Sequence, residues 1–541
     1  MTTTVIVGGV AGGMSTATRL RRNDENMDII VLESSGYVSF ANCGLPYFIG
    51  GEITERSNLL LQTPQSLKSR FNLDVRINST ATSIDRAVKT VTVSGPEGTY
   101  TQKYDYLVLS PGAQPLMPPI PGIKTALTLR NVEDTDRIIE YVQATSARKA
   151  VIIGGGFIGL ELAENLTKRS IATTVIEQAP HIMGPFDEEM AAMVTEHMSN
   201  HGVTIRASSQ VTAIGEGYVA IGDEKVDADI VIAALGVRPA SDLARNAGLE
   251  VNQRGGIMVD SQQRTNDPAI FALGDAAEKT DLISGAGVMI PLAQTANRHG
   301  RLVADVITGR ETHSLPVLGT AIIGLFGLAA ASTGWNERRA RSEGKNIRVI
   351  HSHPVHHAGY YPGASSLHLK LIVDADSDSI LGAQAVGTQG VDKRIDVIAT
   401  AMRAGLKASD LADLELAYAP QFGSAKDPIN MLGFIADNGR TGEQTRQWHE
   451  LDDALADGWQ LVDVRTKAEY NRGTIPGAIN IPVDELRDHV EELRGKKVLV
   501  HCQVGLRGHI ACTMLTNSGL ECANLDGGYI TWSYGQRART A

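Results

Sequence analysis

A strand followed by a glycine-rich turn and a helix occurs twice in this 541-residue sequence, and no other feature constrains the fold as strongly. The second copy is complete: KAVII leads into Gly154-x-Gly156-x-x-Gly159, and the next strand, IATTVIE, ends in Glu177. Such a turn points a helix N-terminus at a pyrophosphate, and the carboxylate accepts the ribose hydroxyls. Because a carboxylate repels a 2′-phosphate, the segment predicts a domain that prefers NADH, with NADPH possible. We assign to this site Gly154, Gly156, Phe157, Ile158, Gly159, Glu161, Glu177 and Gly236.

The first copy stands at the N-terminus and reads Gly8-x-Val10-x-x-Gly13, so the middle glycine of the fingerprint is missing. Its context restores the interpretation, because the strand MDIIVLE ends in Glu33, where a ribose-binding carboxylate belongs. Two later stretches, YDYLVLSPGAQP and TNDPAIFALGDAA, each end a strand in a turn suited to FAD. Together they predict one FAD-binding domain built from two segments, with Gly8, Val10, Ala11, Gly12, Gly13, Glu33, Pro111, Gly112, Gly274 and Asp275 in its site.

The net charge is −11, and no basic stripe appears along the chain, so we expect no nucleic-acid partner. No apolar run predicts a membrane span, and no signal peptide precedes the first strand, which favours the reducing cytoplasm. We expect no metal site. The histidine cluster His351, His353, His356 and His357 lacks a cysteine or carboxylate to complete a ligand set.

The stretch SFANCGLPY holds Cys43, the only cysteine in the first 501 residues. The other three cysteines, Cys502, Cys512 and Cys522, stand near the C-terminus, and none forms a CxxC pair. A single cysteine can undergo redox cycling only if its sulfur partner arrives on a substrate or if it forms a sulfenic acid. At this point the residues leave two interpretations open: an inert buried thiol, or a redox centre that takes its second sulfur from elsewhere.

With both nucleotide sites placed, residues 1 to 440 resemble the two-dinucleotide disulfide reductases, such as glutathione reductase, but the usual CxxxxC pair is absent. SFANCGLPY resembles the single-cysteine branch: coenzyme A (CoA) disulfide reductase, NADH peroxidase and NADH oxidase. Peroxidases of this branch carry a histidine in the first glycine-rich turn, where this chain has Ala11, which favours CoA disulfide reductase. The resemblance implies a Cys43 thiolate, stabilised near the flavin and a helix N-terminus, that attacks a disulfide or persulfide.

The same resemblance implies further site residues. Bound CoA would lie along Ser39 and Asn42, and the remaining CoA-binding candidates are Arg19, Arg22, Gln62, Lys68, Asn297 and Arg301. Residues 315–440 resemble the family's dimerisation domain, in which two tyrosines of the partner subunit reach the catalytic sulfur. HHAGYYPGA offers Tyr361, or its neighbour Tyr360, and ELAYAPQFG offers Tyr418. Simple packing of these rings in an interface is an equally common role.

Residues 445–541 resemble a single rhodanese domain, with Cys502-Gln-Val-Gly-Leu-Arg507 as its active loop. Successive backbone N–H groups of such a loop surround the sulfur at a helix N-terminus and stabilise a persulfide anion. We assign catalytic roles to Cys43, Cys502, Tyr361, Tyr418 and Arg507. Asp463 and Arg465 fit a structural turn, and Cys512 and Cys522 fit the domain core.

The sequence thus predicts an α/β protein with two Rossmann-like dinucleotide-binding domains. The FAD domain spans 1–113 and 238–314, and the NAD(P)H domain 114–237. An α+β dimerisation domain at 315–440 and an α/β rhodanese domain at 445–541 follow. We expect a homodimeric flavin reductase that uses NADH to reduce CoA disulfide, CoA persulfide or polysulfide through Cys43, with Cys502 handling sulfane sulfur. Two alternatives stay open at this point: an NADH oxidase or peroxidase of the same fold, and a sulfur-relay or sensing module with a protein partner.

Overall fold

The computed structural model describes residues 2–540, and these divide into two compact units. The first unit comprises residues 2–178 and 209–319, and the second comprises residues 179–208 and 320–540. None of the helices within residues 2–540 has the length and apolar composition needed to cross a membrane.

A five-stranded parallel sheet with the strand order β17-β7-β1-β2-β3 lies in the first unit. Val7 at the end of β1 is in register with Leu32 and Leu109, the last residues of β2 and β7. The turns that follow these strands therefore meet at one edge of the sheet, as binding at the carboxyl ends of parallel strands requires. The strands are β1 (Thr3–Val7), β2 (Asp28–Leu32), β3 (Asp74–Arg76), β7 (Tyr106–Leu109) and β17 (Ile270–Ala272).

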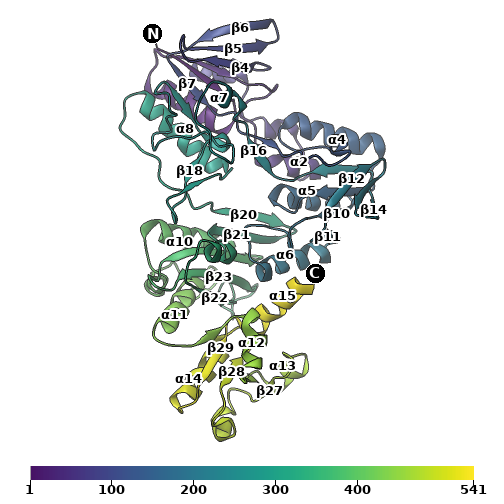
Figure 1. Ribbon diagram of the computed structural model, residues 1–541, viewed down its shortest axis with the longest axis vertical. Helices are drawn as coiled ribbons and strands as arrows, with labels where there is room; N and C mark the ends of the chain where they lie inside the picture. The colour runs from purple at the N-terminus through teal and green to yellow at the C-terminus, as the bar shows by residue number, and fades with distance from the viewer. Residues whose placement is uncertain (1, 541) are drawn as a thin grey trace. The chain divides into compact units, whose positions relative to one another are not determined.

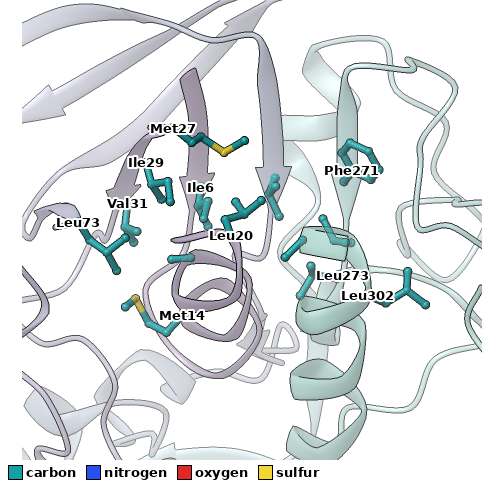
Figure 2. Packing of buried hydrophobic residues seen from close by; sticks show 14 of the residues in the cluster. Ile6, Met14, Leu20, Met27, Ile29, Val31, Leu73, Phe271, Leu273 and Leu302 are labelled. Atoms are coloured by element: carbon teal, nitrogen blue, oxygen red, sulfur yellow. The ribbon is translucent and has the colours of Figure 1, made fainter. Parts of the chain in front are cut away.

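Two helices from distant parts of the chain, α1 (Ala11–Asn23) and α8 (Ala293–Ile307), pack against each other and against this sheet. Helix α1 buries Met14, Ala17 and Leu20, which recur every three residues and so lie on one face. Full burial of a leucine or methionine side chain, such as Leu20 or Met14, contributes about 1.5–3 kcal/mol. The core joins the two expected FAD segments, because it contains residues of both: Ile6, Met14, Leu20, Ile29, Val31, Phe271, Leu273 and Leu302 (Figure 2).

A second set of parallel strands in the first unit runs in the order β10 (Ala172–Ile176), β9 (Lys149–Ile153) and β15 (Ile230–Ala233). Helix α5 (Phe157–Lys168) begins after the turn that follows β9. The two chain crossings between this part and the first sheet, β8 (Ala113–Pro115) and β16 (Val237–Pro239), form an antiparallel pair. The expected domain boundaries at 113/114 and 237/238 fall within these two strands.

The remaining elements of the first unit surround these sheets. They are α2 (Leu45–Gly50), α3 (Pro64–Phe71), α4 (Val132–Thr145), α7 (Asp242–Asn246), β4 (Thr80–Asp85), β5 (Thr90–Gly95), β6 (Gly98–Lys103), β12 (Val211–Gly215), β13 (Tyr218–Ile221), β14 (Glu224–Asp227), β18 (Lys279–Thr280) and β19 (Gly287–Val288).

The second unit contains an antiparallel sheet with the strand order β20-β21-β24-β23-β22 (Figure 1). Helix α10 lies against β21 and β24, and α11 contacts β22. The elements of this part are β20 (Ala321–Leu325), β21 (Leu328–Gly334), α9 (Glu337–Ser342), β22 (Ile347–Ser352), β23 (Leu367–Asp374), β24 (Ile380–Gly387), α10 (Val391–Ala404) and α11 (Pro428–Arg440). The unit also includes α6 (Glu188–Asn200) and β11 (Thr204–Arg206).

A second sheet of this unit is parallel and has the order β25-β29-β28-β26-β27. Cys502 directly follows β28, and helix α14 begins four residues later. Cys512 and Cys522 are buried in the apolar core of this part, which confirms their prediction as core residues. The elements are β25 (Thr445–Arg446), α12 (Leu451–Ala456), β26 (Gln460–Asp463), α13 (Lys467–Asn471), β27 (Ile479–Asn480), β28 (Val498–His501), α14 (Leu506–Asn517), β29 (Cys522–Leu525) and α15 (Gly528–Thr540).

Candidate active site

The two glycine-rich turns of the first unit have matching geometry. Gly8 and Gly154 both have φ in the left-handed region, at +102° and +113°. A Cβ on Gly8 would lie 2.1 Å from the Ser110 carbonyl oxygen, and one on Gly154 would lie 2.3 Å from that of Ala234. Both positions therefore require glycine, because the turn must pass close to the neighbouring strand end.

The predicted ribose-binding carboxylates of Glu33 and Glu177 both accept a hydrogen bond from the glycine-rich turn that precedes them in the chain. Glu33 Oε2 accepts a hydrogen bond of 2.7 Å from the Gly9 N–H, and Glu177 Oε2 accepts one of 2.7 Å from the Gly155 N–H. A Cβ added to Gly156 would meet no atom within 4 Å, so the backbone there faces open space. These residues fit a dinucleotide at each turn, since the phosphates need bare backbone and the ribose needs the carboxylate.

Cys43 lies in a short 3-10 turn, Asn42–Gly44, and is exposed. Loss of water around the sulfur raises the pKa of the Cys43 thiol, and the carboxylates of Glu161 and Asp275 raise it further. Helix α2 begins only at Leu45 and has six residues, so it offers a weak dipole. These groups of the chain raise the pKa of the thiol, and the stabilisation of a Cys43 thiolate near the flavin stays a prediction.

Glu161 lies on α5, one helical turn after the second glycine-rich turn, and its charge acts on Cys43. Burial raises the pKa of Glu161 to about 7, against an opposing contribution from Tyr47, whose hydroxyl donates to Glu161 Oε1 at 3.2 Å. Tyr47 belongs to the SFANCGLPY stretch, yet its role was missed, because sequence spacing does not place α2 beside α5. Glu161 can thus hold or release a proton near neutral pH in the vicinity of Cys43.

We expect the wild-type protein to lose stability relative to Glu161→Gln as pH rises from about 4.5 to about 7. The pKa of Glu161 is about 7 in the folded chain against a reference value of 4.5. Between these values the unfolded chain releases the proton while the folded chain keeps it, so unfolding is favoured progressively. Melting temperatures of both proteins, measured without NADH from pH 4 to pH 8, check this; a constant difference across that range would contradict it.

Several of the predicted CoA-binding residues lie on α1 and α8. Arg22, Asn297 and Arg301 are exposed, and Asn297 accepts a hydrogen bond of 2.6 Å from the Ser15 hydroxyl. Arg19, by contrast, forms an ion pair with Asp305 on α8, with Nε 2.8 Å from Oδ1. A phosphate at Arg19 would compete with this carboxylate, which the sequence did not reveal.

The other predicted CoA-binding residues lie on the segment that carries Cys43 and on α3. Ser39 has a left-handed φ of +47°, and Asn42 is exposed. Gln62 accepts a hydrogen bond of 2.8 Å from Ser66, and Lys68 donates one of 2.8 Å to Asn72. Their role in CoA binding, like that of the α1 and α8 residues, stays a prediction.

The candidate tyrosines of the second unit have different neighbours. The Tyr360 and Tyr418 hydroxyls lie 3.0 Å apart, whereas the ring of Tyr361 packs edge-on against His357. The cause is the tight turn of residues 358–361, in which the Tyr361 N–H donates to the Ala358 carbonyl. Which of Tyr360 and Tyr361 reaches the catalytic sulfur of a partner subunit stays a prediction, as does the role of Tyr418.

The Cys502 loop supplies one of the backbone donors expected of a persulfide site and lies at a helix N-terminus. Its fully buried sulfur accepts a hydrogen bond of 3.2 Å from the Gly505 N–H, immediately before α14. The Tyr529 N–H holds the Cys502 carbonyl at 2.8 Å. Asp463 and Arg465 form a buried ion pair at 2.7 Å. Arg507, the last loop residue, is held by Glu469, a partner that the loop motif does not contain.

Within residues 2–540, no group of three or more His, Cys, Asp or Glu side chains could hold a metal ion. The histidine cluster nevertheless has carboxylate neighbours that the local sequence did not indicate. His351 Nδ1 lies 2.6 Å from Asp526, and His351 Nε2 lies 3.0 Å from Glu189. Burial lowers the pKa of His351, but these two carboxylates outweigh it and raise the pKa to about 9.

Two dinucleotide turns, one accessible cysteine and a separate persulfide loop define a flavin-dependent pyridine nucleotide oxidoreductase with an attached rhodanese domain. Residues 2–300 match the family described as pyridine nucleotide-disulphide oxidoreductase, and residues 320–427 match its dimerisation domain. Residues 447–534 match the rhodanese-like domain. The chain belongs to the pyridine nucleotide-disulphide oxidoreductase family.

Known relatives extend this assignment. The coenzyme A disulfide reductase of Staphylococcus aureus (strain JH9) is 35% identical over 437 residues, covering 80% of this chain and 99% of the relative. The crystal structure of reduced Bacillus anthracis CoADR-RHD has 47% identity and a TM-score of 0.97, covering 99% of this chain and 98% of that one. An NAD-dependent persulfide reductase from A. fulgidus has 38% identity and a TM-score of 0.93, covering 98% of this chain and 100% of that one.

The predicted fold class and the resemblance to this family are thereby confirmed. The predicted cofactors, FAD and NADH, are those of a pyridine nucleotide-disulphide oxidoreductase. FAD fits the turn at Gly8 and Glu33, and NADH fits the turn at Gly154 and Glu177.

Proposed function

We propose that this protein acts in the cytoplasm as a homodimer that uses NADH to reduce CoA disulfide or CoA persulfide through Cys43. Its Cys502 domain delivers sulfane sulfur to the small thiol. The relatives described as coenzyme A disulfide reductase and persulfide reductase support the substrate class. The acidic net charge of −11 supports a small-molecule substrate in preference to a nucleic acid.

The observation that carries the proposal is the exposed Cys43 in the electrostatic neighbourhood of both nucleotide turns. Glu161 stands one helical turn into α5 from the NADH turn, and Asp275 belongs to the FAD segment; both act on the Cys43 sulfur. No other cysteine occurs before Cys502, which supports a sulfur partner for Cys43 that arrives on a substrate.

The chemistry of Cys43 follows from thiol–disulfide exchange. The Cys43 thiolate attacks the CoA-bound sulfur of the persulfide, forms the Cys43–S–S–CoA bond and displaces hydrosulfide. With CoA disulfide the leaving group is the CoA thiolate. FAD, when bound, supplies two electrons taken from NADH. Addition of those two electrons and a proton to the mixed disulfide restores the Cys43 thiolate and frees CoA thiol.

A substrate panel that follows NADH loss and sulfide release together tests the proposal. With CoA persulfide we expect one sulfide for each NADH, and with CoA disulfide we expect NADH loss without sulfide. Polysulfide and glutathione persulfide are measured in the same way, and the rates of NADH loss rank them against the CoA substrates. Rapid NADH loss with oxygen alone, and none above that rate with any disulfide or persulfide, would contradict the proposal and favour the oxidase alternative.

A further inference from the structure

The cationic groups around the Cys502 loop are each held by a carboxylate. Arg507 is paired with Glu469 through two bonds, Nη2 to Oε1 at 2.6 Å and Nη1 to Oε2 at 2.8 Å. Arg465 is paired with the buried Asp463. His509 on α14 lies 2.8 Å from a Glu443 carboxylate oxygen. Arg507, the positive charge within the loop itself, is therefore already neutralised by Glu469.

Two apolar side chains at and after the loop are exposed. Leu506 belongs to the loop itself and is 52% exposed, and Ile510, one helical turn further along α14, is 43% exposed. The buried sulfur receives the Gly505 N–H and lies at the start of a 12-residue helix, whose N-terminus is equivalent to about half a positive charge. This environment suits a sulfur atom with at most one negative charge.

We propose that Glu469 sets the donor specificity of the Cys502 site. By neutralising Arg507, it favours persulfides, which carry at most one charge at the transferred sulfur, over thiosulfate, which is a dianion. The inference rests on the proposed sulfurtransferase role of Cys502. In each transfer the Cys502 thiolate attacks the outer sulfur of the donor, forms Cys502–S–S⁻ and releases the donor's thiolate or sulfite.

Glu469 remains charged at every working pH, because its bonds to Arg507 lower the pKa of the carboxyl to about 2. Its side chain is 21% exposed and that of Arg507 is 31% exposed, so solvent screens the pair only in part. Glu469 also caps α13 by accepting from Thr466, and glutamine can fill the same position of a capping box. Glu469→Gln thus removes the charge and retains the cap.

The test compares thiosulfate and glutathione persulfide as sulfur donors to cyanide, with thiocyanate formation measured on the full-length protein. In Glu469→Gln we expect kcat/KM for thiosulfate to rise on the order of 10-fold, mostly through KM, with little gain for the persulfide. Added salt should reduce the gain. Glu469→Asp, which keeps the charge, should preserve the wild-type ratio between donors.

Glu491→Gln is the matched control, because Glu491 forms an exposed ion pair with Arg494 in the same domain. It should leave the donor ratio unchanged. A donor ratio that is unchanged in Glu469→Gln would overturn the proposal. If the two kcat/KM values change by the same factor, Glu469 only positions Arg507. If Glu469→Gln shows no melting transition, a second variant, Leu506→Lys, replaces it in the test. This variant adds a positive charge at an exposed position of the loop, and it must shift the donor ratio toward thiosulfate.

The outcomes also separate this inference from the proposed function. No sulfur transfer from either donor would overturn the sulfurtransferase role of Cys502 and the specificity role of Glu469 together. Transfer with an unaltered donor ratio would overturn the specificity role alone. NADH-dependent turnover through Cys43 is a separate measurement that neither outcome affects.

Discussion

Replacement of Cys43 by serine is expected to lower NADH-dependent reduction of CoA disulfide by on the order of 10³-fold or more, as loss of an attacking nucleophile does in other enzymes. Serine is nearly isosteric, and Cys43 is exposed, so the fold and the glycine-rich turns should be undisturbed. A serine hydroxyl cannot form the mixed disulfide. The measurement is steady-state NADH oxidation with CoA disulfide, together with the flavin absorbance to verify cofactor content.

Cys502→Ser provides the matched control for this loss. It removes the sulfur of the rhodanese loop while the Cys43 site is unchanged, so CoA disulfide reduction should continue at the wild-type rate. Sulfur transfer to cyanide should disappear in Cys502→Ser and persist in Cys43→Ser. Wild-type turnover of persulfide with NADH in Cys43→Ser would refute the assigned role of Cys43.

Replacement of Lys370 by methionine is expected to destabilise the second unit by about 3–5 kcal/mol, the cost of breaking a buried ion pair by removing one partner. The Lys370 side chain on β23 is fully buried. Its Nζ lies 2.6 Å from Glu189 Oε1 and 2.8 Å from Glu337 Oε2. Asp187 Oδ2 is a further neighbour at 3.0 Å. Burial lowers the pKa of Lys370, but the three carboxylates outweigh it and hold the pKa well above its ordinary value.

Methionine would fill the volume of the lysine stem and remove the buried cation from three carboxylates. Glu189 would then retain His351 and Glu337 would retain Arg341 as cationic neighbours. Urea titration of the free energy of unfolding measures the effect. Lys345→Met is the control, because the Lys345 side chain is 40% exposed and lies 3.6 Å from Asp374. An exposed pair of this kind contributes about 0–1 kcal/mol. Equal losses in the free energy of unfolding of the two variants would show that the buried cluster contributes no more to stability than an exposed ion pair.

The glycine-rich turns could be predicted from sequence because their physics is local. A strand, a turn of fixed spacing and a carboxylate at the end of the next strand all lie within one βαβ unit, and Gly8 and Gly154 have the geometry that the fingerprint requires. The Cys502 loop is predictable for the same reason, since its donor Gly505 stands three residues from the sulfur. Even the two-segment FAD domain follows from strands that end in recognisable turns.

Charge environments were not predictable in this way. The raised pKa of the Cys43 thiol depends on Glu161 and Asp275, more than 100 residues away along the chain. Arg19 was assigned to a phosphate, although Asp305 holds it across two packed helices. Tyr360 rather than Tyr361 lies beside Tyr418, because one residue of turn geometry decides which neighbouring hydroxyl points there.

The sequence by itself determined the two glycine-rich turns with their carboxylates, the lone cysteine of the first 501 residues and the loop after β28, because each depends on residues close together in the chain. Only the tertiary structure decided which charges surround those groups. Glu161 beside Tyr47, Glu469 on Arg507 and Glu189 on Lys370 are contacts between separate elements. Electrostatic energy depends on distance and burial, and neither can be read from spacing along the chain.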